Sequence, residues 1–253
     1  MARLKWENRD IADVVALMDK AIFGYRLIED GDKILIGLSG GKDSLALLEL
    51  LARRSRIRRP SFTVMAAHVA VTNIGYRSDI DYLRSLCEGF GVELVTVETS
   101  YEMATDTRKS PCFLCSWNRR KALFTVAQRH GCNKIALGHH QDDVIETLYM
   151  NMMFQGAFST MPPMLRMRKF DLAVIRPLCL VPESRLVAMA ASRGYKGQVK
   201  ACPYEHQSSR TAVKRLLKEM EALNPEMRHN IWGSMSNVQT EMLPPKIIKH
   251  QKS

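Results

Sequence analysis

Residues 33–44 of this chain read Lys33-Ile-Leu-Ile-Gly-Leu-Ser-Gly-Gly-Lys-Asp-Ser44. Five of the first six residues are apolar or glycine, which is typical of a buried parallel strand. Ser39, Gly40 and Gly41 predict a turn in which the backbone can approach a ligand closely, and the apolar helix 45–52 follows it. A strand, a glycine turn and a helix N-terminus together form an anion site, because the first N–H groups of the helix point at one spot.

The ligand predicted for this turn is a phosphate group, most simply that of a nucleotide. Lys42 adds a mobile positive charge, and Asp43 or Ser44 is expected to cap the helix. The Walker A motif fails here, because Ile36 stands at the position of its first glycine and Asp43 follows the lysine. The segment 39–44 instead looks like the PP-loop of the ATP pyrophosphatase superfamily. Members of that superfamily bind ATP and cleave it between the α and β phosphates.

The composition is that of an ordinary globular protein with an excess of positive charge. The chain has 253 residues, of which 46% are hydrophobic and 25% charged. It contains no apolar run of the ~18–20 residues that a membrane span requires, and its N-terminus does not resemble a signal peptide. The expected compartment is therefore the cytoplasm. Lys and Arg total 37 against 26 Asp and Glu, and the resulting charge of +11 favours a polyanionic partner such as nucleic acid.

Strand and helix patterns alternate through the first two thirds of the chain. The strands are expected at residues 33–38, 61–70, 92–97 and 134–138. The helices are expected at residues 11–27, 45–52, 77–90, 117–130 and 141–154, and further helices near 182–193, 209–223 and 225–239. This alternation predicts an α/β fold with a doubly wound, mostly parallel sheet and a helical C-terminal extension.

The same pattern suggests four parts. Residues 1–30 would form an N-terminal helix, and residues 31–178 the α/β domain that binds the nucleotide and carries the Cys-x-x-Cys. Residues 179–243 would form a helical part that contributes a third cysteine. Residues 244–253 are a basic tail, begun by a proline and expected to fray.

A second polar cluster, Ala136-Leu-Gly-His-His-Gln-Asp-Asp143, stands where a strand ends and a helix begins. Ligands of doubly wound sheets lie beyond the carboxyl ends of the strands, so this cluster and the PP-loop should share one edge. Asp142 and Asp143 could hold Mg²⁺ on a triphosphate, or could simply cap the helix. We expect Gly138, His139 and His68, near the end of the second strand, to complete the nucleotide site.

The chain has six cysteines, and two of them form Pro111-Cys112-Phe-Leu-Cys115 just before the helix expected at 117–130. Cys-x-x-Cys places two thiolates where one metal ion or cluster can bind both. A thioredoxin-like redox pair fits poorly, because the motif follows a third strand. Structural zinc needs four ligands, and the chain offers Cys202, with His206 nearby, as a third. Cys87, Cys132 and Cys179 are interpreted as packing residues.

Taken in order, five motifs resemble those of the tRNA 2-thiocytidine synthetases, a group of PP-loop tRNA thiolases. They are the PP-loop 39–44, Pro111–Cys115 with Arg119-Arg120, Leu137–Asp143, Met161-Pro-Pro163 and Ile175-Arg-Pro-Leu178. The likeness runs from about residue 24 to residue 239. The PP-loop alone indicates only the superfamily, whereas its combination with Cys-x-x-Cys and Gly-His-His-x-Asp-Asp is far more specific.

The resemblance implies ATP-dependent replacement of the 2-oxygen of a cytidine by sulfur, at position 32 of the anticodon loop. The oxygen would be adenylated, and sulfide would then displace AMP. By position, Cys112, Cys115 and Cys202 would carry a [4Fe–4S] cluster. Lys42, Arg119 and the pair Asp142–Asp143 would be catalytic. One departure stands at Glu205, where many relatives carry a further cysteine.

The implied partners are tRNA and a sulfur donor such as a cysteine desulfurase relay, with a homodimer left open. Three alternatives remain at this point. One is a PP-loop ligase or amidotransferase whose Cys112 and Cys115 hold structural zinc. Another is a thiolase that acts on a tRNA uridine with the same residues. The third is a non-catalytic protein that binds ATP and RNA but releases no pyrophosphate.

Overall fold

The computed structural model describes residues 9–57, 59–73, 78–100, 111–167, 170–197 and 209–244. The backbone of residues 111 and 112 is included, but their side chains are not. No helix in these ranges is long and apolar enough to cross a membrane.

Six strands form one sheet in the order β3-β2-β1-β4-β6-β5. The strands are β1 (Lys33–Gly37), β2 (Thr63–Val71), β3 (Leu94–Thr99), β4 (Lys134–Ala136), β5 (Met164–Arg166) and β6 (Ala173–Ile175). All neighbours pair in parallel except β5 and β6, which are antiparallel. The mostly parallel sheet predicted from the sequence is therefore confirmed, and β5 adds an antiparallel edge.

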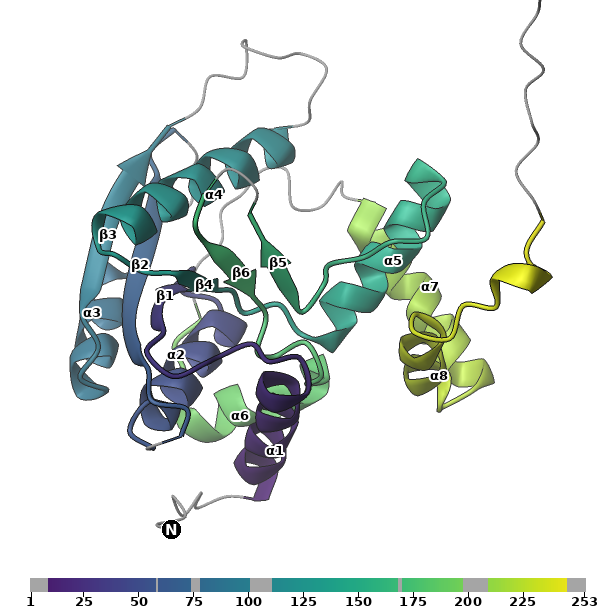
Figure 1. Cartoon of the computed structure of the whole chain (residues 1–253), viewed down its shortest axis with the longest axis horizontal. Helices are drawn as coiled ribbons and strands as arrows, with labels where there is room; N and C mark the ends of the chain where they lie inside the picture. Colours follow the sequence, from purple (N-terminus) through teal and green to yellow (C-terminus); the bar gives the residue numbers. More distant parts are fainter. Residues whose placement is uncertain are drawn as a thin grey trace, which may run out of the picture.

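Helices cover both faces of the sheet (Figure 1). One apolar cluster joins residues of α1 (Arg9–Gly24), α2 (Lys42–Arg54), α3 (Ile80–Gly89) and α6 (Glu183–Arg193) to one side of the strands. A second cluster joins α4 (Pro111–Arg129) to the other side. Alternate residues of β1 enter the two clusters, Ile34 and Ile36 the first and Leu35 the second, as the two-residue period of a strand requires.

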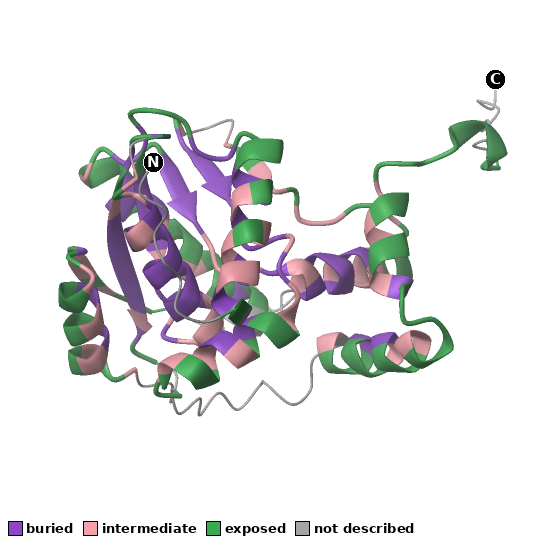
Figure 2. Cartoon of the chain, turned by 90° about the horizontal axis from the view of Figure 1, so that it is seen from below, coloured by how far each residue is buried: buried purple, intermediate pink, exposed green. Residues whose placement is uncertain are grey.

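A smaller helical unit lies beside the sheet at its β5 side. It consists of α5 (Gln141–Gln155), α7 (Ser209–Leu223) and α8 (Met227–Ser234), followed by the short 3₁₀ helix Thr240–Met242. Its own apolar cluster contains Ile145, Val213, Leu217 and Met227. Figure 2 shows this unit set to one side of the sheet, with buried residues among its helices. Because α5 starts directly after β4, this unit meets the carboxyl edge of the sheet.

Two sequence-based helix boundaries were clearly wrong, and one pair of strands was not predicted. Helix α4 begins at Pro111 rather than at 117, so the Cys-x-x-Cys lies within the first five residues of the helix and not before it. Proline is favoured at the first helical position, since the N–H that it lacks has no partner there. The helix expected at 225–239 ends at Ser234, after Gly233. The β5–β6 hairpin was not foreseen as a pair, because strands of three residues carry little periodicity.

Candidate functional site

The turn after β1 is held in shape by two serine hydroxyls. Gly40 has a φ of +83°, a conformation that side chains other than glycine rarely adopt. The Gly40 N–H donates to Ser44 Oγ at 3.1 Å, and the Gly41 N–H donates to Ser39 Oγ at 3.3 Å. The Ser44 hydroxyl in turn donates to the Gly41 carbonyl at 2.9 Å. The turn is therefore fixed by its own side chains before any ligand binds.

Helix α2 starts at Lys42, and no side chain caps it. Its N-cap is Gly41, so the expectation that Asp43 or Ser44 caps the helix is wrong: both lie within the first turn. The first N–H groups of a helix lack the usual intrahelical partner, and here the N-cap residue has no side chain that could accept from them. With the positive end of the helix dipole, they form the anion site predicted from the sequence.

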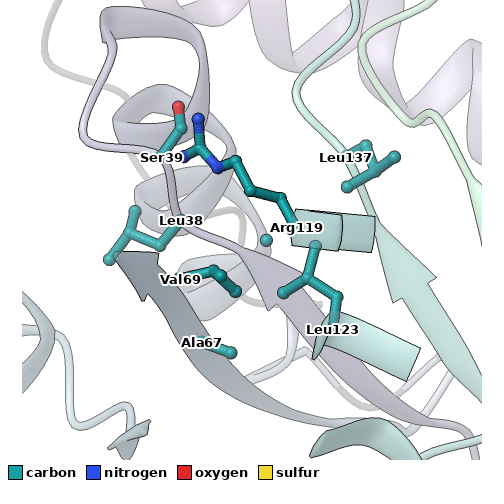
Figure 3. Close-up of a pocket in the computed structure, with 8 residues that line it drawn as sticks. Leu38, Ser39, Ala67, Val69, Arg119, Leu123 and Leu137 are labelled. Atoms are coloured by element: carbon teal, nitrogen blue, oxygen red, sulfur yellow. The ribbon is translucent and has the colours of Figure 1, made fainter. Parts of the chain in front are cut away.

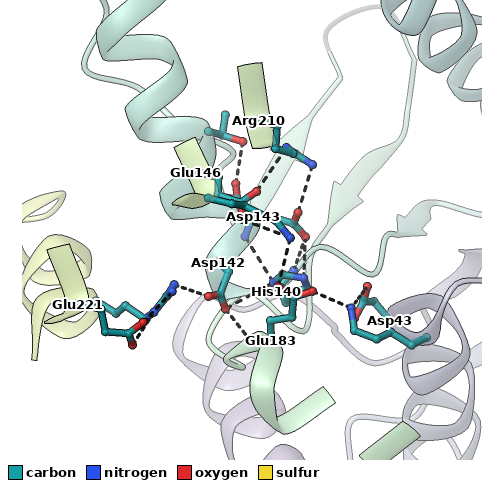
Figure 4. Close-up of polar contacts among 12 residues, drawn as sticks. Asp43, His140, Asp142, Asp143, Glu146, Glu183, Arg210 and Glu221 are labelled. Carbon is teal, nitrogen blue, oxygen red and sulfur yellow. Dashed lines mark hydrogen bonds and ion pairs between the residues drawn. The ribbon is translucent and has the colours of Figure 1, made fainter. Parts of the chain in front are cut away.

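Lys42 crosses from this turn to helix α6. Its ammonium lies 2.9 Å from Glu183 Oε1 and 3.2 Å from Asp43 (Figure 4). Burial lowers the pKa of Lys42, but the hydrogen bonds and charges of these two carboxylates outweigh burial and raise it. Burial alone would raise the pKa of Glu183, yet Lys42 and Lys214 hold it at about 2. Lys42 is therefore charged and tethered in the protein without ATP.

The two adjacent aspartates at the start of α5 face protein partners. Asp143 accepts the His140 N–H at 3.1 Å while the His140 ring accepts the Asp143 N–H, so the two form a capping box. Asp142 accepts the N–H of Glu183 at 2.7 Å and pairs with Arg228 of α8. The helix-cap interpretation therefore holds for Asp143. Asp142 instead connects α5 to α6 and α8.

These carboxylates are part of a larger charged network (Figure 4). Arg210 of α7 lies 3.3 Å from Asp143 and 3.4 Å from Glu146, and Lys214 lies 3.6 Å from Glu146 and 3.3 Å from Glu183. The described residues contain no group of three or more His, Cys, Asp or Glu side chains arranged to hold a metal ion. A magnesium ion here would therefore depend on the phosphates of ATP for part of its coordination.

An apolar pocket lies beside the PP-loop, between β1, β2 and α4 (Figure 3). Its volume is about 140 Å³, and it is lined by Gly37, Leu38, Ser39, Ala67, Val69, Arg119, Leu123 and Leu137. Pockets that enclose a whole small ligand measure roughly 300–1,000 Å³, so this one fits only part of a nucleotide, such as its base. The Arg119 side chain extends across the opening of the pocket towards Ser39 (Figure 3). Arg119 thus joins the PP-loop to the helix of the Cys-x-x-Cys.

Two of the three further residues predicted for the nucleotide site, His68 and Gly138, lie against the PP-loop and the residues beside it. Nδ1 of His68 lies 2.7 Å from the Leu38 carbonyl; burial lowers the pKa of His68, so the neutral ring donates this bond. A Cβ on Gly138 would lie 3.0 Å from the Asp43 backbone, so only glycine lets β4 approach the start of α2 so closely. Burial also lowers the pKa of His139 to about 4.

The cysteines fall into two groups, as the sequence suggested. Cys87, Cys132 and Cys179 are buried in the two main apolar clusters, and burial raises their pKa values, that of Cys87 to about 11. Their interpretation as packing residues is confirmed. Cys115 is half-buried, packs beside Val71 and Leu114, and lies one turn before Arg119 on α4. The side chain of Cys112 and the whole of Cys202 lie outside the described residues.

Sequence reasoning missed every site residue contributed by α6, α7 and α8. They are Glu183, Arg210, Lys214 and Arg228, and they contact Lys42 or the acidic residues of α5. These residues lie far along the chain from their partners, so the spacing of residues within a motif could not indicate the contacts. The only available hint was the placement of an acidic residue, Glu183, directly after Pro182 at a helix start.

Comparison with known proteins gives one family and a consistent set of relatives. Residues 13–220 match the model of a PP-loop domain. A tRNA-cytidine(32) 2-sulfurtransferase from Syntrophotalea carbinolica is 36% identical over 96% of this chain and 95% of its own length. The protein of the same name from Alkalilimnicola ehrlichii is 35% identical over 91% of this chain and 74% of its own.

One solved structure is also similar over most of its length. It is the U34-tRNA thiolase NcsA from Methanococcus maripaludis with its [4Fe–4S] cluster. The two chains share 27% identity and a TM-score of 0.76, and the match covers 93% of this chain and 81% of the other.

Proposed function

This chain belongs to the PP-loop domain family, and we propose that it is an ATP-dependent tRNA thiolase that forms 2-thiocytidine at position 32 of the anticodon loop. The observation that carries the proposal is the position of Arg119. Its side chain lines the pocket beside the PP-loop, and its helix begins with the Cys-x-x-Cys. The relatives named tRNA-cytidine(32) 2-sulfurtransferase, similar over nearly the whole chain, support the same substrate.

In this proposal the PP-loop binds the phosphates of ATP. The N-terminus of α2 receives the phosphate oxygens, the positive φ of Gly40 lets the backbone of the turn lie close to them, and the adenine enters the apolar pocket. Lys42 leaves Glu183 for the triphosphate, whose higher charge competes for the ammonium. The cytidine 2-oxygen then attacks the α phosphate: one O–P bond forms, the bond to the β phosphate breaks, and pyrophosphate leaves.

Arg119 and Lys42 would stabilise the charge that develops on the α phosphate. Fixed cations in a partly dehydrated site stabilise such a transition state far more than water does. Asp142 and Asp143, at the same edge of the sheet, would orient Mg²⁺ on the phosphates, with Asp143 held by its capping box. His68 and Gly138 act indirectly, because they fix Leu38 and Asp43.

The position of Cys115 near the start of α4 supports an iron–sulfur cluster at this end of the helix. Cys112 and Cys115 lie within the first five residues of α4, where the helix dipole and the cations that follow favour thiolates. Cys115 is half-buried at the end of the helix that also carries Arg119. Cys112, Cys115 and Cys202 would hold a [4Fe–4S] cluster, which would hold the sulfide that displaces AMP.

The proposals for the sulfur donor and the cellular compartment depend on this function. The sulfur donor would be a cysteine desulfurase relay, and the compartment would be the cytoplasm, where tRNA is modified. A homodimer and the division of the chain at residues 30, 178 and 243 are proposals that the fold leaves open. The similarity to a U34-tRNA thiolase favours, as the second candidate, a thiolase that acts on a uridine.

The test is thiolation of transcribed tRNA by protein purified without oxygen, with ATP and sulfide, followed by digestion to nucleosides and mass spectrometry. We expect 2-thiocytidine, and its loss when the cytidine at position 32 is replaced by uridine. Formation of 2-thiouridine alone would establish the second candidate instead. Absence of any thionucleoside, with pyrophosphate still released, would contradict both.

Metal analysis of the same sample separates the thiolase from a zinc-bearing ligase. We expect about four irons per chain, as a [4Fe–4S] cluster requires. Cys202→Ala should lose iron and thiolation but still bind ATP, whereas Cys132→Ala should keep its iron, because Cys132 is buried in the core. One zinc and no iron in the wild-type protein would overturn the cluster assignment, and full iron in Cys202→Ala would overturn the role of Cys202.

A further inference from the structure

Two large aromatic side chains are exposed on α4 beside the site. Phe113 is 48% exposed and Trp117 is 55% exposed. They are four residues apart, so they lie one above the other on the same side of the helix. Other residues of this part of α4 face the protein instead: Leu114 is buried, and Cys115 and Arg119 are half-buried. The aromatic pair thus leaves about half of its surface open to solvent.

The same side of α4 is positively charged. Arg120 and Lys121 follow Trp117 by three and four residues, and both are exposed. Helix α4 contains no acidic residue over its 19 positions. A surface that combines aromatic rings with cations and lacks carboxylates suits single-stranded nucleic acid, because bases stack on the rings and phosphates pair with the cations. It suits a second copy of this chain poorly, since each copy carries a charge of +11.

This side of α4 also borders the carboxyl edge of the sheet. The charge of Arg120 contributes to lowering the pKa values of His139, which follows β4, and of Arg176, which follows β6. Arg120 therefore lies within reach of the strand ends where the nucleotide site is built. Since Trp117 is one turn from Arg120, the aromatic pair stands next to that edge and not on a remote surface.

We propose that Trp117, together with Phe113, forms a stacking platform that receives unpaired bases of the anticodon loop and presents the target base to the PP-loop. The inference rests on the proposed function and adds the residues that select a single-stranded loop. Arg120 and Lys121 would bind the adjacent phosphates. Trp117 is in this view a positioning residue, because Lys42 and Arg119 act on the reacting phosphate.

The test compares RNA binding by the wild-type protein, Trp117→Ala and Trp117→Phe. The ligands are an anticodon stem–loop and a fully paired duplex with the same stem. We expect Trp117→Ala to bind the stem–loop at least about 10-fold more weakly and to raise KM for tRNA more than it lowers kcat. Trp117→Phe keeps a ring and should stay within about 3-fold of the wild type. Duplex binding, which offers no unpaired base, should not change.

Phe23→Ala is the matched control. Phe23 is 58% exposed on α1, on the opposite face of the sheet from α4 (Figure 1), and its loss should leave RNA binding unchanged. Fluorescence gives a second readout: the stem–loop should quench the emission of the wild-type protein more than that of Trp117→Phe, because stacked bases quench a contacted indole.

Three results would overturn the platform. One is equal stem–loop affinity in Trp117→Ala and the wild type. Another is an equal loss of affinity for stem–loop and duplex, which would assign the surface to phosphate contacts alone. The third is a change from dimer to monomer in Trp117→Ala at unchanged RNA affinity, which would make the pair an interface between copies. Failure of the proposed function is separate, because the wild-type protein would then form no thionucleoside at all.

Discussion

Among single residues, Lys42 carries the charge that the reaction needs. Without ATP its ammonium is held between Asp43 and Glu183, at 3.2 Å and 2.9 Å. These partners keep it charged despite partial burial and place it over the uncapped start of α2. A phosphate that enters the anion site therefore meets a cation already in position.

We predict that Lys42→Met lowers kcat/KM for pyrophosphate release by about 10²-fold or more, the loss typical when a fixed charge no longer stabilises the transition state. The measurement is pyrophosphate release with ATP and tRNA both present. Lys20→Met, an exposed lysine on α1, should match the wild type. Turnover of Lys42→Met within about 3-fold of the wild type would remove Lys42 from the mechanism.

Gly138 is the second residue whose identity has a direct steric cause. A Cβ there would lie 3.0 Å from the carbonyl carbon and oxygen of Asp43 and 3.1 Å from the N of Ser44. These are backbone atoms of the first turn of α2, which cannot rotate away as a side chain can. Any added atom must therefore push the PP-loop away from β4.

We predict that Gly138→Ala destabilises the fold by about 1–3 kcal/mol, as overpacking does, and raises KM for ATP. Gly89→Ala is the matched control, because a Cβ at Gly89 would meet nothing within 4 Å. Urea unfolding and initial rates measure the two effects. If Gly138→Ala and Gly89→Ala gave the same stability and the same KM, the close approach of β4 to α2 would have no consequence.

For individual residues, the sequence predicted those that belong to contiguous motifs and missed their partners from distant parts of the chain. Ser39, Gly40 and Lys42 form the anion site because adjacent residues define both the turn and the helix start. Glu183 and Arg228 could not be found, since they follow Lys42 and Asp142 by 141 and 86 positions. Only the packing of α6 and α8 brings them close.

Between elements, the ion pair of Lys42 and Glu183 connects α2 to α6. Glu183 is the first residue of α6, where a negative charge also meets the positive end of the helix dipole. Its pKa of about 2 in the folded protein lies below the ~4.3 of an unfolded glutamate. Glu183 therefore stabilises the fold above pH ~4.3, and this contribution is lost as the pH falls towards about 2.

We predict that Glu183→Gln lowers the free energy of unfolding by on the order of 1 kcal/mol at pH 7, a figure reduced for the partial exposure of Glu183. The difference from the wild type should shrink as the pH falls from 4.5 to 3. Urea titrations at pH 7, 4.5 and 3 measure it. Glu219→Gln, on the exposed side of α7 and without an ion pair among the described residues, should show no such trend. A difference that stays constant down to pH 3 would contradict the assigned role.

The type of a helix or strand was predictable where apolar residues recur regularly over a long segment. Its ends were predictable only where capping residues mark them. The expected helix 141–154 agrees with α5 to within one residue, because His140 and Asp143 cap its start and Gly156 ends it. The start of α4 was placed six residues late, since the Cys-x-x-Cys was interpreted as a loop motif. Proline followed by a cysteine pair fits a first helical turn equally well.

For the whole molecule, the order of the strands explains why the motifs meet. The chain runs outward from β1 to β2 and β3, and then returns to place β4 on the other side of β1. Loops that follow β1 and β4 therefore diverge from one point at the carboxyl edge, which is where doubly wound sheets bind ligands. This convergence was predicted from the alternation of strands and helices. The docking of α7 and α8 on α5 was not, because it depends on a small apolar cluster and on ion pairs between helices.

The net charge of +11 belongs to the whole molecule, but its contribution to RNA binding should be concentrated on the side of α4. Binding of RNA phosphates by lysine and arginine releases counterions, so the logarithm of affinity falls linearly with the logarithm of salt concentration. Lys121 is exposed on α4, next to the proposed platform, whereas Lys20 is exposed on α1, which covers the other face of the sheet (Figure 1).

We predict that affinity for tRNA falls at least about 10-fold between 50 and 200 mM salt, while affinity for ATP changes less, because fewer counterions are released. Lys121→Ala should reduce the slope of log affinity against log salt by about 1, as the loss of one phosphate contact does. Lys20→Ala should leave the slope unchanged. The measurement is a series of filter-binding titrations at three salt concentrations. Equal slopes for Lys121→Ala and Lys20→Ala would mean that the charge acts as a diffuse field around the whole protein and that α4 makes no phosphate contact through Lys121.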